Sequence, residues 1–263
     1  MGANGNIFMQ GQNVNKVFKV GEQDVNVLKN VNMEIHEGDF AIIFGPSGSG
    51  KSTLLHCLLG LESPTSGNIL IEGKNFYDMN EDERAIFRRH RVGMIYQQPL
   101  WINSMNIMEN VVFALHLLDY NEDLIEQKGK KVLETVGMQD WATYRPRELS
   151  SGQQQKVSLA RSLVIDPALI VADEPTGNLD TVSGQNLIQT FLDVNAKGLT
   201  VIMITHELEY LKYANRLIHV VDGEVVENYS TKNRVTKVQV GEESKSGDTI
   251  TLHDHDYAKK LNL

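Results

Sequence analysis

The sequence predicts an α/β protein with a mostly parallel sheet and helices on both faces. The unbroken apolar run at residues 168–172 and the mainly apolar run at residues 200–205 are typical of strands that a parallel sheet buries on both sides. A third apolar run, Phe40–Phe44, leads through glycines into a helical pattern, and further helical patterns alternate with these strands. Around this core we expect an N-terminal antiparallel β subdomain and an inserted α-helical subdomain.

Composition limits the functional classes. The chain has 263 residues, of which 41% are hydrophobic and 22% are charged, as in an ordinary globular protein of one large or two smaller domains. The formal net charge of -9 argues against nucleic-acid binding, which needs a basic surface. Cys57 is the single cysteine, so an intrachain disulfide is impossible and a reducing compartment is expected.

The N-terminal part is read as β structure. Residues 1–12 are rich in Gly, Asn and Gln, and we expect them to be mobile. From Val14 to Ile35, β-type runs separated by Gly21 and Asn30 predict antiparallel strands. An aromatic ring on one of these strands, Phe18, either stacks on a nucleotide base or is simply half-buried, and the strand pattern does not choose between the two.

A glycine-rich loop follows the run Phe40–Phe44 and precedes a helix. Its residues are Gly45, Pro46, Ser47, Gly48, Ser49, Gly50, Lys51, Ser52 and Thr53. Strand, glycine-rich loop and helix in this order define a P-loop, in which backbone N–H groups and the helix N-terminus bind phosphate oxygens. We expect Lys51 to reach the β- and γ-phosphates of a nucleotide and Ser52 to bind Mg²⁺.

The next segment alternates strands and helices. Residues 68–71 predict a strand, the charged run 81–91 a solvated helix, and residues 92–96 a strand that ends at Gln97. Asn106 with Glu109 fits a helix capping box. Further helices are expected over about 121–136, ending at Gly137, and from Ser151 onward.

The C-terminal part completes the sheet. The strand at 168–172 ends in Asp173 and Glu174, a helix is expected over about 181–196, and the strand at 200–205 ends at His206. Asp222 and Gly223 predict the two-residue turn of a hairpin. Residues 229–263 form a polar C-terminal extension to which we assign no role.

Four polar side chains follow strand ends, where ligands gather in an α/β sheet. Asp173 suits a ligand of Mg²⁺, and Glu174 suits the base that orients an attacking water. Gln97 could reach the metal or that water. His206 could contact a γ-phosphate or hold Glu174, although a single histidine is more often structural.

A second anion site is predicted at Ser150, Ser151, Gly152 and Gln153, where a serine hydroxyl meets backbone N–H groups at a helix start. Because the P-loop already supplies one phosphate site, we expect this second site to act in trans. It would contact the γ-phosphate bound to a partner protomer, as an arginine finger does.

The order of these motifs resembles the nucleotide-binding subunit of ABC transporters over residues 7–228. The segments 14–18, 96–98 and 173–180 are similar to the branch that includes lipoprotein-release, macrolide-export and cell-division ATPases. The resemblance implies that Phe18 stacks on the base, that Gln97 and His206 are the Q-loop and switch residues, and that Asp180 links two sites across a dimer. Ser151 and Lys156 depart from the family pattern, which has glycine and arginine there.

The resemblance also implies the cofactors and partners. It implies ATP with Mg²⁺ held by Ser52, Gln97 and Asp173, a homodimer, and an integral membrane permease that docks on the helical subdomain at about 98–165. The chain would then lie at the cytoplasmic face of the cell membrane. Three alternatives stay open: a signalling ATPase of the cell-division type, a soluble ABC-type ATPase, and a P-loop kinase, against which residues 149–153 count.

Overall fold

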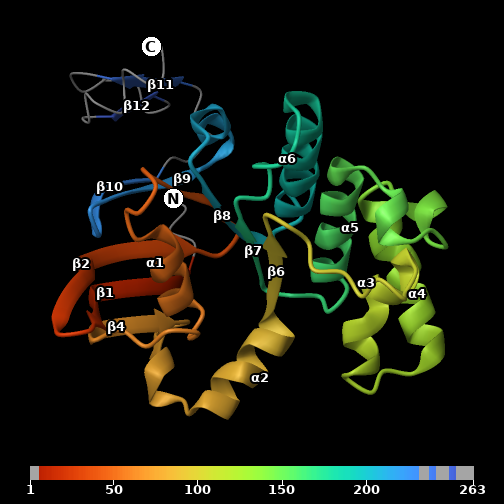
Figure 1. Ribbon diagram of the computed structural model, residues 1–263, viewed down its shortest axis with the longest axis horizontal. Helices are drawn as coiled ribbons and strands as arrows, with labels where there is room; N and C mark the ends of the chain where they lie inside the picture. The colour runs from red at the N-terminus through yellow and green to blue at the C-terminus, as the bar shows by residue number, and fades with distance from the viewer. Residues whose placement is uncertain (1–5, 231–236, 241–248, 253–263) are drawn as a thin grey trace. The chain divides into compact units, whose positions relative to one another are not determined.

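The computed structural model describes residues 6–230, 237–240 and 249–252, which fall into two compact units (Figure 1). The first unit comprises the described residues of 1–80 and 202–263, and the second comprises residues 81–201. The predicted helical subdomain at 98–165 lies within the second unit. None of the helices in the described ranges is long and apolar enough to cross a membrane.

The elements follow the predicted alternation of strands and helices. In chain order they are β1 (Ile7–Val20), β2 (Gln23–His36), β3 (Phe40–Phe44), α1 (Lys51–Leu58), β4 (Ser66–Ile71), β5 (Lys74–Asn75), η1 (Phe76–Asp78), α2 (Glu81–Arg91), β6 (Val92–Tyr96), α3 (Ile107–His116), α4 (Glu122–Thr135), η2 (Gln139–Trp141), η3 (Pro146–Glu148), α5 (Ser151–Leu163), β7 (Leu169–Asp173), α6 (Thr181–Asn195), β8 (Thr200–Thr205), η4 (Leu208–Tyr213), β9 (Arg216–Val221), β10 (Glu224–Ser230), β11 (Lys237–Val240) and β12 (Thr249–Leu252).

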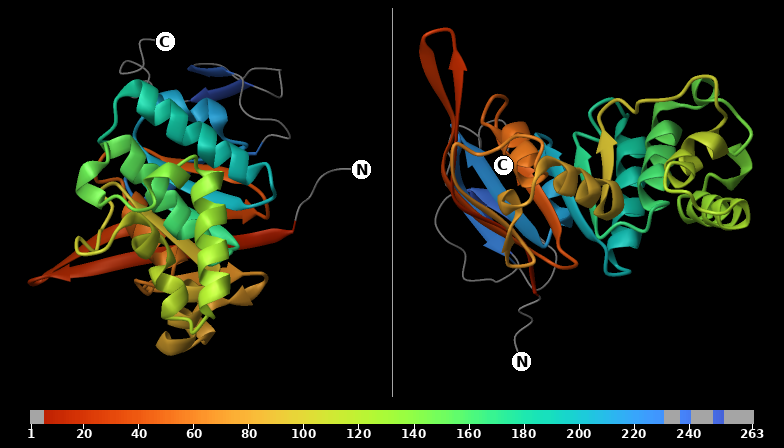
Figure 2. Two further views of the ribbon diagram at one scale, coloured as in Figure 1. Left: turned by 90° about the vertical axis from the view of Figure 1, so that its right-hand side faces the viewer. Right: turned by 90° about the horizontal axis from the view of Figure 1, so that it is seen from below.

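The first unit contains an antiparallel sheet in the order β2-β1-β4-β5. β1 and β2 are 14 residues long, whereas β4 has six, so the far end of their hairpin extends beyond β4 (Figure 2). Residue 21 lies in the turn between β1 and β2, as predicted. Asn30 does not separate two strands; it lies within β2 with a positive φ of 48°.

The expectation of a mobile segment over residues 1–12 is wrong for residues 7–12, which belong to β1; residues 1–5 lie outside the described ranges. Phe8 and Met9 are fully buried, and Met9 pairs with Ile71 of β4. The polar composition of residues 7–12 did not indicate a strand. Its polar side chains are accommodated because they bond to the neighbouring strand β2: Gln10 Nε2 donates to Glu34 Oε1 at 2.9 Å.

A second, mainly parallel sheet has the order β10-β9-β3-β8-β7-β6, and the boundary between the units falls within β8. In the first unit β3 pairs in parallel with β9, and β10 returns antiparallel to β9. A buried ion pair between Asp39 and Arg216 fixes the start of β3 beside β9. Asn215 joins this pair, since its Nδ2 donates to Asp39 Oδ1 at 3.0 Å and its Oδ1 accepts the Phe40 N–H at 2.7 Å.

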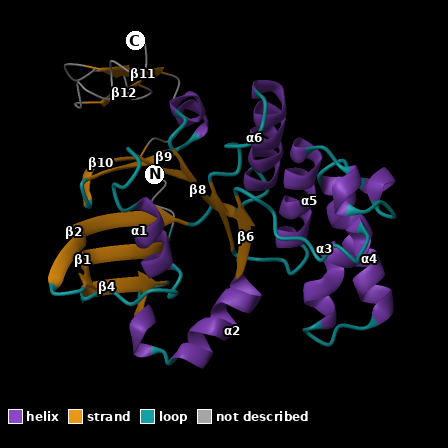
Figure 3. Ribbon diagram, viewed as in Figure 1, coloured by secondary structure: helices purple, strands orange, loops and turns teal. Residues whose placement is uncertain are grey.

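In the second unit β6 and β7 pair in parallel, and every regular element between them in the chain is a helix (Figure 3). α5 packs against β6, and Gly93 permits the approach: a Cβ there would lie 2.5 Å from the Ser162 carbonyl oxygen. The predicted capping box is present, because Asn106 and Glu109 each accept the other's backbone N–H. α3 contacts α4 and α5, which gives the helical part its own core.

Cys57 is completely buried in α1, where it packs as a small hydrophobic residue. Burial raises the pKa of the Cys57 thiol to about 11, an effect that Lys16 opposes and Glu62 reinforces. Since the thiolate is the reactive species, we expect iodoacetamide at neutral pH to leave the native protein unmodified while it alkylates the urea-unfolded protein fully. Intact-mass spectrometry would measure this, and fast alkylation of the native protein would contradict the buried position.

Candidate functional site

The predicted site residues fall into two groups, one in each unit. The first unit holds Phe18, the P-loop and His206. The second unit holds Gln97, the segment 150–153, Asp173, Glu174 and Asp180.

The P-loop connects the end of β3 to the start of α1. Gly48 and Gly50 have φ values of 79° and 100°, a region that side chains disfavour. Gly50 is the N-cap of α1 and brings no side chain to cap the first turn. The helix N-terminus, with its partial positive charge and no side-chain cap, has the geometry that a phosphate site requires.

The P-loop rests on the turn of the β9–β10 hairpin, a contact that sequence reasoning missed. The Gly223 N–H donates to the Ser49 carbonyl oxygen at 3.0 Å. A Cβ on Gly45 would lie 1.9 Å from the Val220 carbonyl oxygen, and one on Gly50 would lie 2.8 Å from that of Val27. The loop thus packs backbone against backbone, with no space for side chains at these glycines.

The side chains of the P-loop divide by exposure. Lys51 is buried, and its Nζ donates to the carbonyl oxygens of Gly45 and Pro46 at 2.9 and 2.8 Å. Ser47 and Ser52 are exposed, so the Ser52 hydroxyl is accessible to a metal ion. The Ser49 hydroxyl is buried and has no hydrogen-bond partner within the described part of the chain.

The other predicted residues of the first unit lie on its strands. Phe18 lies in β1 opposite Val25 of β2 and is half-buried. His206 is exposed and directly follows β8. Their roles at a nucleotide remain predictions.

In the second unit the carboxylates and Gln97 lie at the ends of two adjacent strands. Tyr96 of β6 is opposite Asp173 of β7, so Gln97 and Glu174 leave the sheet side by side. Glu174 has a positive φ of 47°, which is uncommon for a non-glycine residue and frequent at functional sites. A Cβ on Gly177 would lie 2.8 Å from Gln97 Nε2, so glycine there leaves room for the Gln97 side chain.

The predicted second anion site begins α5 with a capping box. Ser150 Oγ accepts the Gln153 N–H at 3.3 Å, and Gln153 Oε1 accepts the Ser150 N–H at 2.9 Å. Ser151, which departs from the family glycine, is exposed in the first turn. The two bonds of the cap fix the backbone of this helix N-terminus.

The residues after Gln153 form contacts that the sequence did not reveal. Gln154 accepts from Trp101 Nε1 at 2.8 Å. Gln155 is buried, and its Nε2 donates to the carbonyl oxygens of Tyr96 and Gln97 at 3.0 and 2.8 Å. The helix that begins at the anion site therefore holds the backbone of Gln97. The run of three glutamines was the available signal, but glutamine alone does not indicate its partner.

Asp180 is the N-cap of α6 and lies near the same helix start. Its carboxylate accepts the N–H and the hydroxyl of Ser183 at 2.9 and 2.7 Å, and these bonds hold the pKa of Asp180 below its usual value. A Cβ on Gly152 would lie 3.0 Å from the Ser183 side chain. The structure thus brings the start of α5 and the Asp180 turn together.

The sequence profile of the ABC transporter family matches residues 28–177. The chain belongs to this family. It is 45% identical over 219 residues to the ABC transporter ATP-binding protein MJ1508 of Methanocaldococcus jannaschii, covering 83% of this chain and 98% of that protein. It is 42% identical to the macrolide export ATP-binding/permease protein MacB of Bdellovibrio bacteriovorus, covering 80% of this chain but only 32% of that longer protein.

A solved structure agrees with the fold. The ATP-binding cassette MJ0796, also from Methanocaldococcus jannaschii, is described as dimeric and bound to ADP and Pi. It matches with a TM-score of 0.76 at 35% identity and covers 84% of this chain and 98% of its own. The predicted fold class and ATPase class are confirmed by these comparisons, and an unrelated P-loop kinase is excluded.

We predict that Gly223→Ala weakens ATP binding although residue 223 lies far from the P-loop in sequence. The new Cβ would lie 2.4 Å from the Val27 carbonyl oxygen at a φ of 85°, so the turn must shift and disturb the bond from the Gly223 N–H to Ser49. Calorimetry should show about a tenfold higher Kd, equivalent to about 1.4 kcal/mol.

Gly73→Ala is the matched control, because Gly73 also occupies a hairpin turn, at a φ of 78°, but a Cβ there meets nothing within 4 Å. We expect this variant to bind ATP normally. Equal Kd values for the two variants would show that the hairpin does not support the P-loop.

Proposed function

We propose that this chain is the ATP-hydrolysing subunit of an ABC transporter, and that two copies close head-to-tail on two ATP·Mg²⁺ and drive a membrane permease. One observation supports the dimer: two helices, α1 and α5, begin at the two segments for which the sequence predicts phosphate sites. If each chain bound one nucleoside triphosphate on its own, only the helix start at α1 would be needed. In a two-fold dimer, the start of α5 in one protomer would contact the nucleotide bound to the P-loop of the partner protomer.

The relatives support this arrangement. MJ0796 is dimeric in its structure with ADP and Pi, and the match covers 84% of this chain and 98% of MJ0796. MacB combines an ATP-binding part with a permease, and the present chain matches only about a third of it. We propose that an integral membrane permease docks on residues 98–165 and holds the chain at the cytoplasmic face of the membrane.

The proposed Mg²⁺ ligands suit that ion. Ser52, Gln97 and Asp173 offer a hydroxyl, an amide and a carboxylate oxygen, which are the hard donors that Mg²⁺ prefers. The ion, when bound, would neutralise charge on the phosphates. Lys51, by its position at the P-loop, would place an ammonium on the phosphate oxygens.

Glu174 and His206 would then act on the attacking water. Water oxygen bonds to the γ-phosphorus, the bond from that phosphorus to the β-γ bridging oxygen breaks, and ADP leaves. Glu174 orients the water and takes up its proton as the new P–O bond forms, and His206 supports the γ-phosphate or Glu174. Phe18 stacks on the base. Ser150, Ser151, Gly152, Gln153 and Asp180 complete the site of the partner protomer.

Two alternatives, a signalling ATPase and a soluble ABC-type ATPase, differ from the transporter in the partner that the chain binds and in whether that partner moves a substrate. Purification of the chain from native membranes under mild detergent tests this. We expect a stoichiometric integral membrane protein whose presence raises the ATPase rate. Transport of a substrate by the reconstituted pair supports the transporter, whereas a pair that hydrolyses ATP and moves nothing supports the signalling class.

We predict that Glu174→Gln lowers the ATPase rate by about 10²–10⁴-fold and leaves ATP affinity close to normal, because the amide cannot accept the proton of water. Single-turnover hydrolysis and calorimetry separate the two effects. Glu72→Gln is a matched control, since Glu72 has a similar φ of 49° at a strand end outside the site. Normal turnover in Glu174→Gln would exclude the assigned role.

We predict that a mixture of Ser150→Arg and Lys51→Ala proteins recovers part of the ATPase rate that each has lost. A mixed dimer has one site with both lesions and one with neither. No recovery, although sizing shows that mixed dimers form, would contradict action in trans.

Ser150→Arg also removes the cap of α5, which we expect to cost about 1 kcal/mol of stability. Asn121→Arg is the matched control, because Asn121 caps α4 in the same way by accepting the Leu124 N–H at 2.8 Å. This variant should lose similar stability in thermal melts and keep its ATPase rate.

A further inference from the structure

We propose that Lys16 is a positioning residue for nucleotide binding: its ammonium holds the ring of Phe18 in the orientation that stacks on the base. The inference rests on the proposed function, in which Phe18 is the stacking residue. Lys16 Nζ lies 4.7 Å from the centre of the Phe18 ring, within the range of a cation–π interaction. It therefore covers one face of the ring, and the base would take the other.

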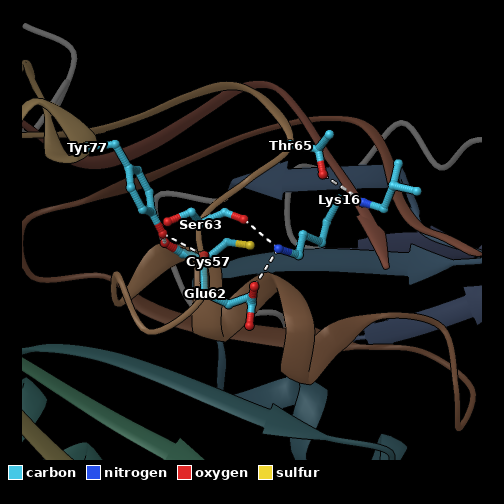
Figure 4. A network of polar contacts seen from close by, with 7 residues as sticks. Lys16, Cys57, Glu62, Ser63, Thr65 and Tyr77 are labelled. Atoms are coloured by element: carbon cyan, nitrogen blue, oxygen red, sulfur yellow. Dashed lines mark hydrogen bonds and ion pairs between the residues drawn. The ribbon is translucent and has the colours of Figure 1, made fainter. Parts of the chain in front are cut away.

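Lys16 is unusual because its charge is buried. The residue is only 8% exposed, and its Nζ contacts the Glu62 carboxylate and donates to the Ser63 carbonyl oxygen at 2.7 Å (Figure 4). Removing a charge from water is costly, and an apolar residue would fill this strand position without that cost. The ammonium of Lys16 is thus held in a fixed place, over one face of the Phe18 ring.

The backbone beside Lys16 is fixed to the same segment. Thr65 Oγ1 accepts the Val17 N–H at 2.9 Å, and the Thr65 N–H donates to the Asn15 carbonyl oxygen at 2.8 Å (Figure 4 shows the Thr65 and Lys16 contacts). Residues 15–17 of β1, which immediately precede Phe18, are therefore all hydrogen-bonded to Ser63 or Thr65. The pairing of β1 with β2 also shifts register on both sides of Lys16. Such irregularities re-aim side chains near functional sites.

The segment that holds Lys16 is an extension of the P-loop helix. Residues 62 and 63 follow α1 closely, and the Tyr77 hydroxyl lies 2.7 Å from the Glu62 carbonyl oxygen and 2.8 Å from that of Cys57 in α1 (Figure 4). The Glu62 N–H also donates to the His56 carbonyl oxygen of α1 at 3.2 Å. The helix that begins at the phosphate site therefore ends at the support of the ring, so both ends of a nucleotide would be positioned from one helix.

The test compares a nucleotide with a ligand that has no base. We expect Lys16→Met to raise the Kd for ATP about three- to tenfold and to leave the Kd for inorganic triphosphate unchanged. Phe18→Ala should have an equal or larger effect on ATP, and adding Lys16→Met to it should cost nothing more. Lys16→Arg should restore most of the affinity. Lys19→Met, at an exposed position of the same strand, should bind both ligands normally.

The outcomes separate this inference from the proposed function. If Phe18→Ala leaves the Kd for ATP unchanged, the base-stacking role fails, and the inference fails with it. If Phe18→Ala weakens ATP binding and Lys16→Met does not, the inference alone is overturned. Equal weakening of ATP and triphosphate by Lys16→Met also overturns it, because that result means a general structural role. Should Lys16→Met not fold, Glu62→Gln, which removes the counter-charge, must weaken ATP binding selectively or the inference is rejected.

Discussion

The structure of the first unit depends on the close approach of two backbone turns, the P-loop and the tip of the β9–β10 hairpin. Gly45 packs against the Val220 carbonyl oxygen of β9, and Gly50 and Gly223 both pack against that of Val27 in β2, so a Cβ at any of the three would lie within 3 Å of a backbone oxygen. The other end of β3 is fixed to β9 by the Asp39–Arg216 pair. The backbone of the P-loop is therefore supported by residues that lie far from it in the sequence, in β2, β9 and the turn at residues 222–223.

The parts of the fold that the sequence predicted are those that local chemistry determines. The P-loop, the turn at residues 222–223 and the helix starts at Asn106 and Asn121 each depend on residues within a few positions of one another. The buried strands could be predicted for the same reason, since an unbroken apolar run has few other uses. The motif order then placed the chain in its family, and the comparisons agree.

The features that the sequence did not reveal involve contacts between distant segments. Residues 7–12 look like a flexible polar segment until Gln10 is seen to bond Glu34 and Met9 to pair beside Ile71. Gln155 and Lys16 carry no local pattern either, because their partners are backbone carbonyl groups or a carboxylate far along the chain. A side chain that bonds a distant backbone group does not require any particular residue type there, so the sequence holds no record of the pair.

Gln153, Gln154 and Gln155 show what such contacts imply for movement. Successive residues of a helix point about 100° apart, so Gln154 and Gln155 fasten the first turn of α5 in two directions, to Trp101 and to the Gln97 backbone, whereas Gln153 bonds the cap of the same helix. The turn can neither rotate nor slide along its axis without breaking at least one bond. A displacement of this turn would therefore pull on the Gln97 backbone through Gln155, so the start of α5 and the end of β6 are mechanically linked.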